Sequence, residues 1–271
     1  SSHAVHQQRI AGAHFAGAIF TNLSHDHLDY HGSFAEYAKA KKGFFDQLTP
    51  RAFALTNIDD RRGEYMLQNC AARHFSYALR TPADFKALII ENHLTGLHLE
   101  VDGVEVHTRL VGDFNAYNFL CVYAAAVLLK PKEDAQTILQ VLSRLHPAEG
   151  RFERVPLPTK PDVLAIVDYA HTPDALEQVL QTLDRLRAGT GRIITVVGCG
   201  GDRDRTKRPL MAKIACTYSQ IALLTSDNPR SEQPEAILAE MQAGVPAHVP
   251  ADRGEVIVER RAAIQRAVSL A

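Results

Sequence analysis

The stretch Phe20–Phe45, FTNLSHDHLDYHGSFAEYAKAKKGFF, decides how this chain of 271 residues is organised. It starts inside a short apolar segment, Ala16–Leu23, that has the composition of a buried strand, and Ser33 can cap a helix over Phe34–Leu48. Between these elements, three histidines and two aspartates stand within His25–His31, a density that no hydrophobic core needs. A strand that runs into such a loop and then into a helix is where α/β proteins usually carry out chemistry. The sequence therefore predicts an α/β fold with a functional loop at this point.

The overall composition excludes several classes of partner. Lys and Arg number 30 against 31 Asp and Glu, a net charge of -1, which argues against a bulk electrostatic partner such as nucleic acid or an anionic membrane surface. The four cysteines form no CxxC pair, so neither a zinc ribbon nor a disulfide framework is indicated, and we expect a reducing, cytoplasmic setting. No apolar run approaches the roughly 18 residues of a membrane helix. Because the chain starts without Met or a signal peptide, we expect it to be a fragment of something longer.

The first half predicts a mixed sheet with helices. Short β runs at Ala87–Glu91, Gly96–Val101 and Val104–Leu110 indicate a meander, with Asp102-Gly103 as a two-residue hairpin turn. Two helices are expected after it. The segment His146–Gly150 is the best linker, so we expect domains over 1–149 and 150–271.

The second half alternates between strands and helices. Strands are expected at Leu164–Asp168, Ile193–Val197 and Ile221–Thr225, each followed by a helix, with a last helix over Glu255–Ser269. This alternation is typical of a parallel, doubly wound sheet.

Polar residues follow these three strands directly. The clusters are Asp168-Tyr169-Ala170-His171, Gly198–Asp204 and Asp227-Asn228-Pro229-Arg230. In an open parallel sheet the ligand crevice lies beyond the carboxyl ends of the strands, so three clusters at one edge predict a binding site. Arg203 and Arg230 can each hold a carboxylate or phosphate with a planar fork of donors.

The histidine cluster allows two interpretations. His25–His31 nearly spells the HxHxDH zinc motif of metallo-β-lactamase-like hydrolases, but Tyr30 stands where the last histidine belongs. In the other interpretation only His27 faces a metal, and a lysine follows on the adjacent helix. Lys39, Lys41 and Lys42 are flanked by aromatic residues, so one of them is expected to point inward.

Motifs over the whole chain resemble those of the Mur ligases of peptidoglycan synthesis. In order they are Ser1-Ser2-His3-Ala4, TNLSHDHLDYHG, AKAK, GDFNAYN, GRFE, VDYAHTPDALE, GCGGDRDRTKRP and DNPRSEQP. The resemblance implies that 1–149 form the later part of the central ATP-binding domain and 150–271 an incomplete Rossmann-like C-terminal domain. No GxxxxGK[ST] P-loop occurs, and the GKGHE segment of the family is missing, so the chain is expected to be inactive alone.

The resemblance also implies a reaction and its residues. In this family ATP phosphorylates a carboxylate, and an amine attacks the acyl phosphate to form an amide, with Mg²⁺ neutralising phosphate oxygens. His27 matches the metal-binding histidine, and Lys41 matches a lysine that adds CO2 to become a carbamate ligand for the metal. The other implied sites are Asn115, Arg151, Asp168 and His171 for ATP, with Asn118 nearby; Ser1, Gln7 and Arg9 for UDP-MurNAc-L-Ala-D-Glu; and Arg203, Asp227, Asn228, Pro229 and Arg230 for the incoming amino acid.

The DNPR motif indicates which amino acid is added. Meso-diaminopimelate differs from lysine by a second carboxylate, which Arg230 would attract, whereas the ammonium of lysine would be repelled. The expected function is therefore addition of meso-diaminopimelate by a monomeric enzyme. The alternatives are a lysine-adding ligase, a folylpolyglutamate synthetase-like ligase and the zinc hydrolase. His25 stands where relatives usually have arginine.

Overall fold

The computed structural model describes residues 1–24, 28–187, 189, 191–250 and 253–271. It divides into two compact units, which we describe one at a time. The first unit comprises Ser1–Ser24 and Tyr30–Pro147, and the second is formed mainly by Ala148–Ala271. The metal-binding prediction at His27, and the zinc alternative that also uses His25, fall on residues outside the described part.

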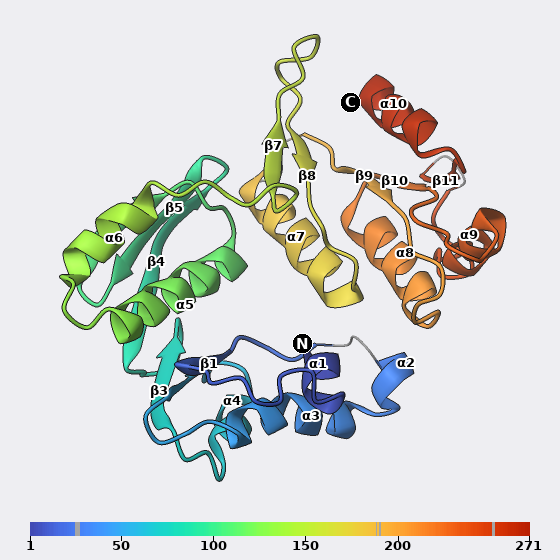
Figure 1. The fold of residues 1–271 in the computed structure, drawn as a ribbon. Helices are drawn as coiled ribbons and strands as arrows, with labels where there is room; N and C mark the ends of the chain where they lie inside the picture. Colours follow the sequence, from blue (N-terminus) through green and yellow to red (C-terminus); the bar gives the residue numbers. More distant parts are fainter. Residues whose placement is uncertain (25–27, 188, 190, 251–252) are drawn as a thin grey trace. The chain divides into compact units, whose positions relative to one another are not determined.

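The first unit contains a mixed sheet in the order β1-β2-β3-β4-β5-β6 (Figure 1). Its strands are β1 (Gly17–Phe20), β2 (Phe53–Asn57), β3 (Arg73–Ala78), β4 (Phe85–His93), β5 (Gly96–Val101) and β6 (Val104–Thr108). The strands from β1 to β4 pair in parallel, and those from β4 to β6 form the predicted antiparallel meander. At the β5–β6 turn, Asp102 and Gly103 have φ of 48° and 82°, the left-handed backbone that a two-residue hairpin turn requires.

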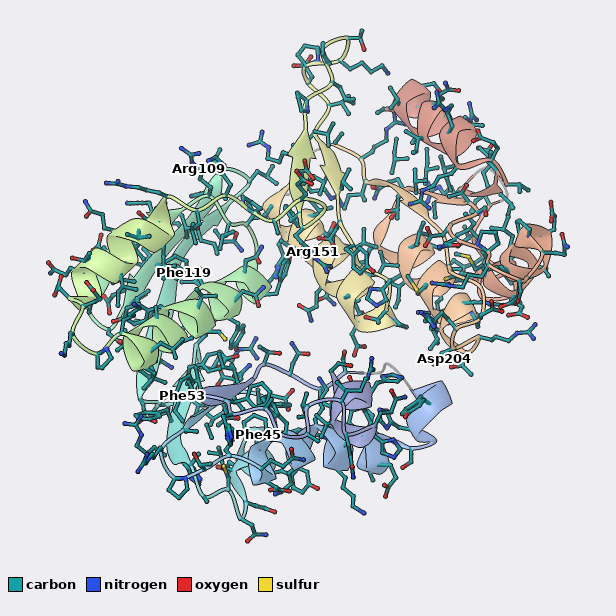
Figure 2. All side chains as sticks on the ribbon, in the orientation of Figure 1. Phe45, Phe53, Arg109, Phe119, Arg151 and Asp204 are labelled. Carbon is teal, nitrogen blue, oxygen red and sulfur yellow. The ribbon has the colours of Figure 1, made fainter. Side chains whose placement is uncertain are left out.

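This unit has six helices in the described residues, of which α3, α5 and α6 were expected from the sequence and α1 and α2 were not. They are α1 (Ser2–His6), α2 (Leu28–His31), α3 (Phe34–Asp46), α4 (Gly63–Leu67), α5 (Asp113–Leu129) and α6 (Ala135–Ser143). At the start of α3 the Ser33 hydroxyl accepts a hydrogen bond from the Glu36 N–H at 3.2 Å. Helices α5 and α6 cover one face of the meander (Figure 1). Phe53 and Phe119, labelled in Figure 2, both belong to the core of this unit.

The second unit holds a parallel sheet in the order β11-β10-β9. Its elements are β7 (Glu153–Val155), β8 (Ala165–Val167), α7 (Pro173–Leu186), β9 (Ile194–Val197), α8 (Lys207–Tyr218), β10 (Ile221–Leu224), α9 (Pro234–Gln242), β11 (Gly254–Val256) and α10 (Arg260–Leu270). Helix α8 packs on one side of β9 and β10, and α10 packs on the other (Figure 1). Helices on both faces of a parallel sheet are the predicted doubly wound arrangement.

Two elements of the second unit differ from the prediction. The strand predicted at Leu164–Asp168 pairs antiparallel with β7 instead of extending the parallel sheet, because Glu153–Val155 supplies its backbone partners. The helix predicted over Glu255–Ser269 is wrong at its start, since β11 pairs in parallel with β10. The β-branched run Val256-Ile257-Val258 favours an extended backbone there. Helix α10 begins only after Glu259, whose carboxylate accepts a hydrogen bond from the N–H of Arg261 at 3.0 Å.

None of the helices in the described ranges is both long and apolar enough to cross a membrane.

Candidate functional site

The residues predicted to hold the nucleotide-linked peptide lie on and just after α1. Ser1, Gln7 and Arg9 are all exposed. The Gln7 side chain donates a hydrogen bond to the Tyr30 hydroxyl at 2.9 Å, and His6 contacts the same hydroxyl at 3.0 Å. Tyr30 lies on α2 and within the His25–His31 stretch, so this end of the stretch is tied to α1.

An aromatic cluster links α1 to α3. His31 Nε2 lies 2.9 Å from the Ser2 hydroxyl, and its ring stacks on Tyr37 with centroids 5.3 Å apart. The Lys41 ammonium lies 5.2 Å from the centroid of the Tyr37 ring, within the range of a cation–π contact. Lys41, the predicted carbamate, is half-buried at this point.

Lys42, and not Lys41, is the most buried of the three helix lysines. Lys39 is exposed, whereas Lys42 is only 8% exposed, pairs with Asp46 and donates to the Gln68 carbonyl at 2.5 Å. A buried ammonium held by a carboxylate and a carbonyl is a structural group, so Lys42 anchors α3 to the segment after α4.

Two polar residues at the end of β2 hold the loop that leads into the histidine cluster. The Asn57 amide donates to the Thr21 carbonyl at 2.9 Å, and an Asp60 carboxylate oxygen accepts from the Leu23 N–H at 3.1 Å. We did not expect this role from the sequence. The signal was present, however, because the run Asn57-Ile58-Asp59-Asp60 starts at the last residue of a fully buried strand.

Asp59 joins three segments of the first unit. Its carboxylate accepts hydrogen bonds at 2.7–2.9 Å from the N–H groups of residues 79–81, the Thr81 hydroxyl and the Tyr117 hydroxyl. Burial raises the pKa of this carboxyl, but the bonds from Thr81, Arg80, Tyr117 and Leu79 outweigh burial and hold the pKa well below its ordinary range. Asp59 therefore remains charged and fixes the start of α5.

The predicted ATP contact Asn115 is engaged within α5. It is 9% exposed, donates to the Val111 carbonyl at 2.8 Å, and accepts from the side-chain amide of Asn118 at 3.1 Å. Asn118 is exposed. Asn115 thus orients the amide of Asn118, which is the more accessible of the two.

The other predicted ATP contacts come together in the second unit. The Arg151 guanidinium, labelled in Figure 2, lies 4.3 Å from the centroid of the Tyr169 ring, which is 61% exposed. Asp168 accepts from the Phe152 N–H and the Ala170 N–H, both at 2.8 Å, and so joins the Arg151 turn to the end of β8. The His171 ring lies 5.0 Å from that of Tyr169. A cation, a carboxylate and two exposed rings can together hold a planar base and polar groups.

The predicted amino-acid pocket residues gather at the carboxyl ends of β9 and β10. Arg203 follows β9, Asp227-Asn228-Pro229-Arg230 follows β10, and Arg203, Asp227, Asn228 and Arg230 are exposed. The two loops touch directly: the Gly201 N–H donates to the Asn228 carbonyl at 2.9 Å, and Arg230 donates to the Gly201 carbonyl at 2.5 Å. A Cβ on Gly201 would stand 1.9 Å from the Pro229 carbonyl oxygen, so only glycine allows this approach.

A buried charge network lies beneath these loops. Arg208, on α8, is 0% exposed and bonds Glu232 and Glu240. The Arg208 guanidinium, followed by the Asp202 N–H, lowers the pKa of Glu232 to about 2. The sequence prediction missed this network, whose signal was a third arginine in GDRDRTKRP and a glutamate two residues after DNPR.

The described residues contain no complete set of side chains that could ligate a metal ion. No group of three or more His, Cys, Asp or Glu side chains converges there on a metal-sized position. Cys121, Cys199 and Cys216 are thiols whose pKa is raised by burial, which does not favour metal binding.

Two family models match the chain. The Mur ligase middle domain matches residues 1–126, and the Mur ligase glutamate ligase domain matches residues 150–271.

Curated relatives match the chain from end to end. The UDP-N-acetylmuramoyl-L-alanyl-D-glutamate--2,6-diaminopimelate ligases of Cytophaga hutchinsonii and Parabacteroides distasonis are each 52% identical, over 273 and 271 residues, and cover 100% of this chain. The chain covers 54% and 55% of them, so it spans about half the length of the curated relatives it matches.

Solved structures show the same fold. A UDP-N-acetylmuramoyl-L-alanyl-D-glutamate--2,6-diaminopimelate ligase is similar with a TM-score of 0.60 and 35% identity, covering 100% of this chain and 55% of that one. A pseudomurein peptide ligase type C from Methanothermus fervidus has a TM-score of 0.72 and 20% identity, and the match covers 97% of this chain and 60% of that one. A folylpolyglutamate synthase from Thermotoga maritima has a TM-score of 0.65 and 15% identity, and the match covers 92% of this chain and 55% of that one. At 20% and 15% identity, these last two structures show a likeness of fold alone.

Proposed function

Since this chain belongs to the Mur ligase family and carries its middle and C-terminal domains, we propose that it is part of an ATP-dependent ligase that adds meso-diaminopimelate to UDP-MurNAc-L-Ala-D-Glu. The observation that carries the proposal is 52% identity along the whole chain to relatives named for that acceptor. The proposed domains are 1–149 and 150–271. The enzyme would work in the cytoplasm as a monomer.

The acceptor pocket is proposed at Arg203 and Asp227-Asn228-Pro229-Arg230. Two arginine forks and one carboxylate suit an amino acid that carries two carboxylates and two ammonium groups. Arg230 is the group that would separate diaminopimelate from lysine, because lysine lacks the second carboxylate and would leave the Arg230 charge without that partner. The exposure of Arg203 and Arg230, on loops that touch each other, supports this assignment.

ATP is proposed to bind through Arg151, Asp168 and His171 in the second unit and through Asn115, with Asn118, in the first. The exposed Tyr169 ring beside the Arg151 guanidinium fits a planar base. No GxxxxGK[ST] occurs in these 271 residues, so phosphate binding needs a segment that this chain lacks.

Mg²⁺ would be held by His27 and by Lys41 as a carbamate, and it would offset negative charge on phosphate oxygens when bound. The half-buried position of Lys41 supports the assignment, since Lys42 is already committed to its ion pair with Asp46. Ser1, Gln7 and Arg9 would hold the nucleotide-linked dipeptide.

The proposal is tested by product identity. The full-length ligase that carries these residues should convert UDP-MurNAc-L-Ala-D-Glu, ATP and meso-diaminopimelate into a product whose mass equals that of the two substrates less one water. The 271-residue chain alone is the negative control and should form no product. If the full-length enzyme forms no such product, the proposed function is wrong.

A further inference from the structure

Arg208 is a charged group without any exposed surface, and three of its four hydrogen bonds reach the loop after β9 or the segment after β10. It makes two bonds to Glu232, at 2.6 and 2.9 Å, one to Glu240 at 2.7 Å and one to the Gly200 carbonyl at 3.3 Å. A buried guanidinium is retained only when such partners compensate for its lost hydration. Its position is therefore set by the loop after β9 and the segment after β10 together.

Glu232 extends this contact from one loop to the other. Both carboxylate oxygens of Glu232 bond Arg208, and one of them, Oε1, also accepts the Asp202 N–H at 2.7 Å. Asp202 in turn accepts from the Ser231 hydroxyl at 2.6 Å and the Ser231 N–H at 3.2 Å. Each loop thus supplies a carboxylate that binds the backbone of the other.

The residues that form these bonds between the loops include the direct neighbours of the two exposed arginines. Asp202 precedes Arg203, and Ser231 follows Arg230. Asp202 and Arg230 both have left-handed backbones, with φ of 51° and 53°, which is unfavourable for residues other than glycine. Such backbones persist only when surrounding contacts impose them, and the contacts present here include the bonds of Asp202, Ser231 and Glu232.

We propose that the Arg208–Glu232 pair and Asp202 are positioning residues that fix Arg203 relative to Arg230 and thereby determine recognition of a dicarboxylic amino acid. They touch no substrate themselves. The inference rests on the proposed function, since it assigns a task to the same pocket. The chain offers a matched control in Glu240, which binds the same buried guanidinium from α9. Glu240 also pairs with Arg205 of the loop after β9, but its bonds to Arg205 and Arg208 do not connect that loop to the segment after β10.

The test uses the full-length ligase with Glu232→Gln and Glu240→Gln. Both substitutions remove one carboxylate from Arg208, but only the first weakens the link between the loops. We expect Glu232→Gln to raise KM for meso-diaminopimelate about tenfold, while KM for ATP changes less than twofold. Glu240→Gln should change KM for diaminopimelate less than threefold, at a similar loss of thermal stability. Asp202→Ala, at an exposed position, should raise KM for diaminopimelate about threefold with a smaller loss of unfolding temperature than either glutamate variant.

Three outcomes separate the possibilities. If both glutamate variants lose acceptor affinity equally, the network only stabilises the fold and the inference is wrong. If KM for diaminopimelate is unchanged in Glu232→Gln and Asp202→Ala, the loops need no such lock and the inference is also wrong. If the unmodified full-length enzyme does not use diaminopimelate at all, the proposed function fails first, and that result is recognisable without any variant.

Discussion

Replacing Asp59 by asparagine should destabilise the first unit in a pH-dependent way. The carboxylate accepts five hydrogen bonds, three at one oxygen (Leu79 N–H, Arg80 N–H and Tyr117 hydroxyl) and two at the other (Thr81 N–H and hydroxyl). Whichever oxygen becomes an amide nitrogen, at least two donors lose their acceptor. At about 1.5–3 kcal/mol for a hydrogen bond to a charged group, and with a discount for partial exposure, we expect a loss of about 2–4 kcal/mol at pH 7.

The direction of the pH effect follows from the lowered pKa of Asp59. A carboxyl whose pKa is lowered on folding contributes stability above its unfolded pKa of 3.8, and this stability is lost as the pH falls towards the folded pKa. The difference between the original protein and Asp59→Asn should therefore be full at pH 7 and should shrink below about pH 4. Other carboxyls titrate equally in both proteins and cancel.

Urea unfolding followed by circular dichroism measures this difference at pH 7 and pH 3, and hydrogen exchange should show faster exchange of the Leu79, Arg80 and Thr81 amides. Asp84→Asn is the control, because Asp84 is exposed and its carboxylate bonds Ser76, so the substitution should cost less than about 1 kcal/mol. If the difference for Asp59→Asn is the same at both pH values, the charged form of Asp59 does not stabilise the fold as described.

Three further substitutions test other parts of the structure. Gly201→Ala should lower the free energy of unfolding by about 1–3 kcal/mol, because the new Cβ would overlap the Pro229 carbonyl and force the loops apart; a melting temperature equal to that of the original protein would contradict this. Arg230→Ala in the full-length ligase should raise KM for meso-diaminopimelate more than about tenfold (about 1.4 kcal/mol) and leave KM for ATP nearly unchanged; equal losses for both substrates would mean that the pocket is elsewhere. Asn57→Ala removes the bond to the Thr21 carbonyl and should cost about 1–2 kcal/mol of stability while raising the Mg²⁺ concentration needed for half-maximal activity; an unchanged Mg²⁺ requirement would show that this loop needs no such support.

Local signals in the sequence predicted most elements, and the structure shows why they did so. The Asp102-Gly103 turn and the Ser33 cap are determined by the residues themselves, since left-handed backbone and side-chain capping have narrow residue preferences. The family fold followed from motifs that run through the chain. The comparisons confirm the Mur ligase family and its α/β fold.

Partner choice between strands was harder to predict. Residues Ala165–Val167 form a strand as expected, but whether they join β9 or fold back on Glu153–Val155 depends on contacts distant in sequence. The strand β3 was not predicted, because its first residues, Arg73 and His74, are exposed and only its end is buried. Strand pairing is decided by tertiary packing, which a single sequence pattern does not encode.

Site residues with unusual chemistry could be predicted from the sequence. Residues whose role depends on being buried could not. Arg203 and Arg230 stand out in the sequence, and the structure brings their loops into contact. By contrast, the lysine run did not show that Lys42 is the residue buried against Asp46, and the three arginines of GDRDRTKRP did not show that Arg208 is the fully buried one. Which member of a charged run turns inward depends on the neighbours that the fold provides.

The most direct test of the central claim is phosphate release by the full-length ligase, supplied with ATP, Mg²⁺ and UDP-MurNAc-L-Ala-D-Glu, and offered meso-diaminopimelate or L-lysine in separate reactions. We expect release with diaminopimelate and at most a small fraction of that rate with lysine. Equal or greater release with lysine would retain a Mur ligase but contradict the assignment of Arg230 and its loop as the group that selects the acceptor.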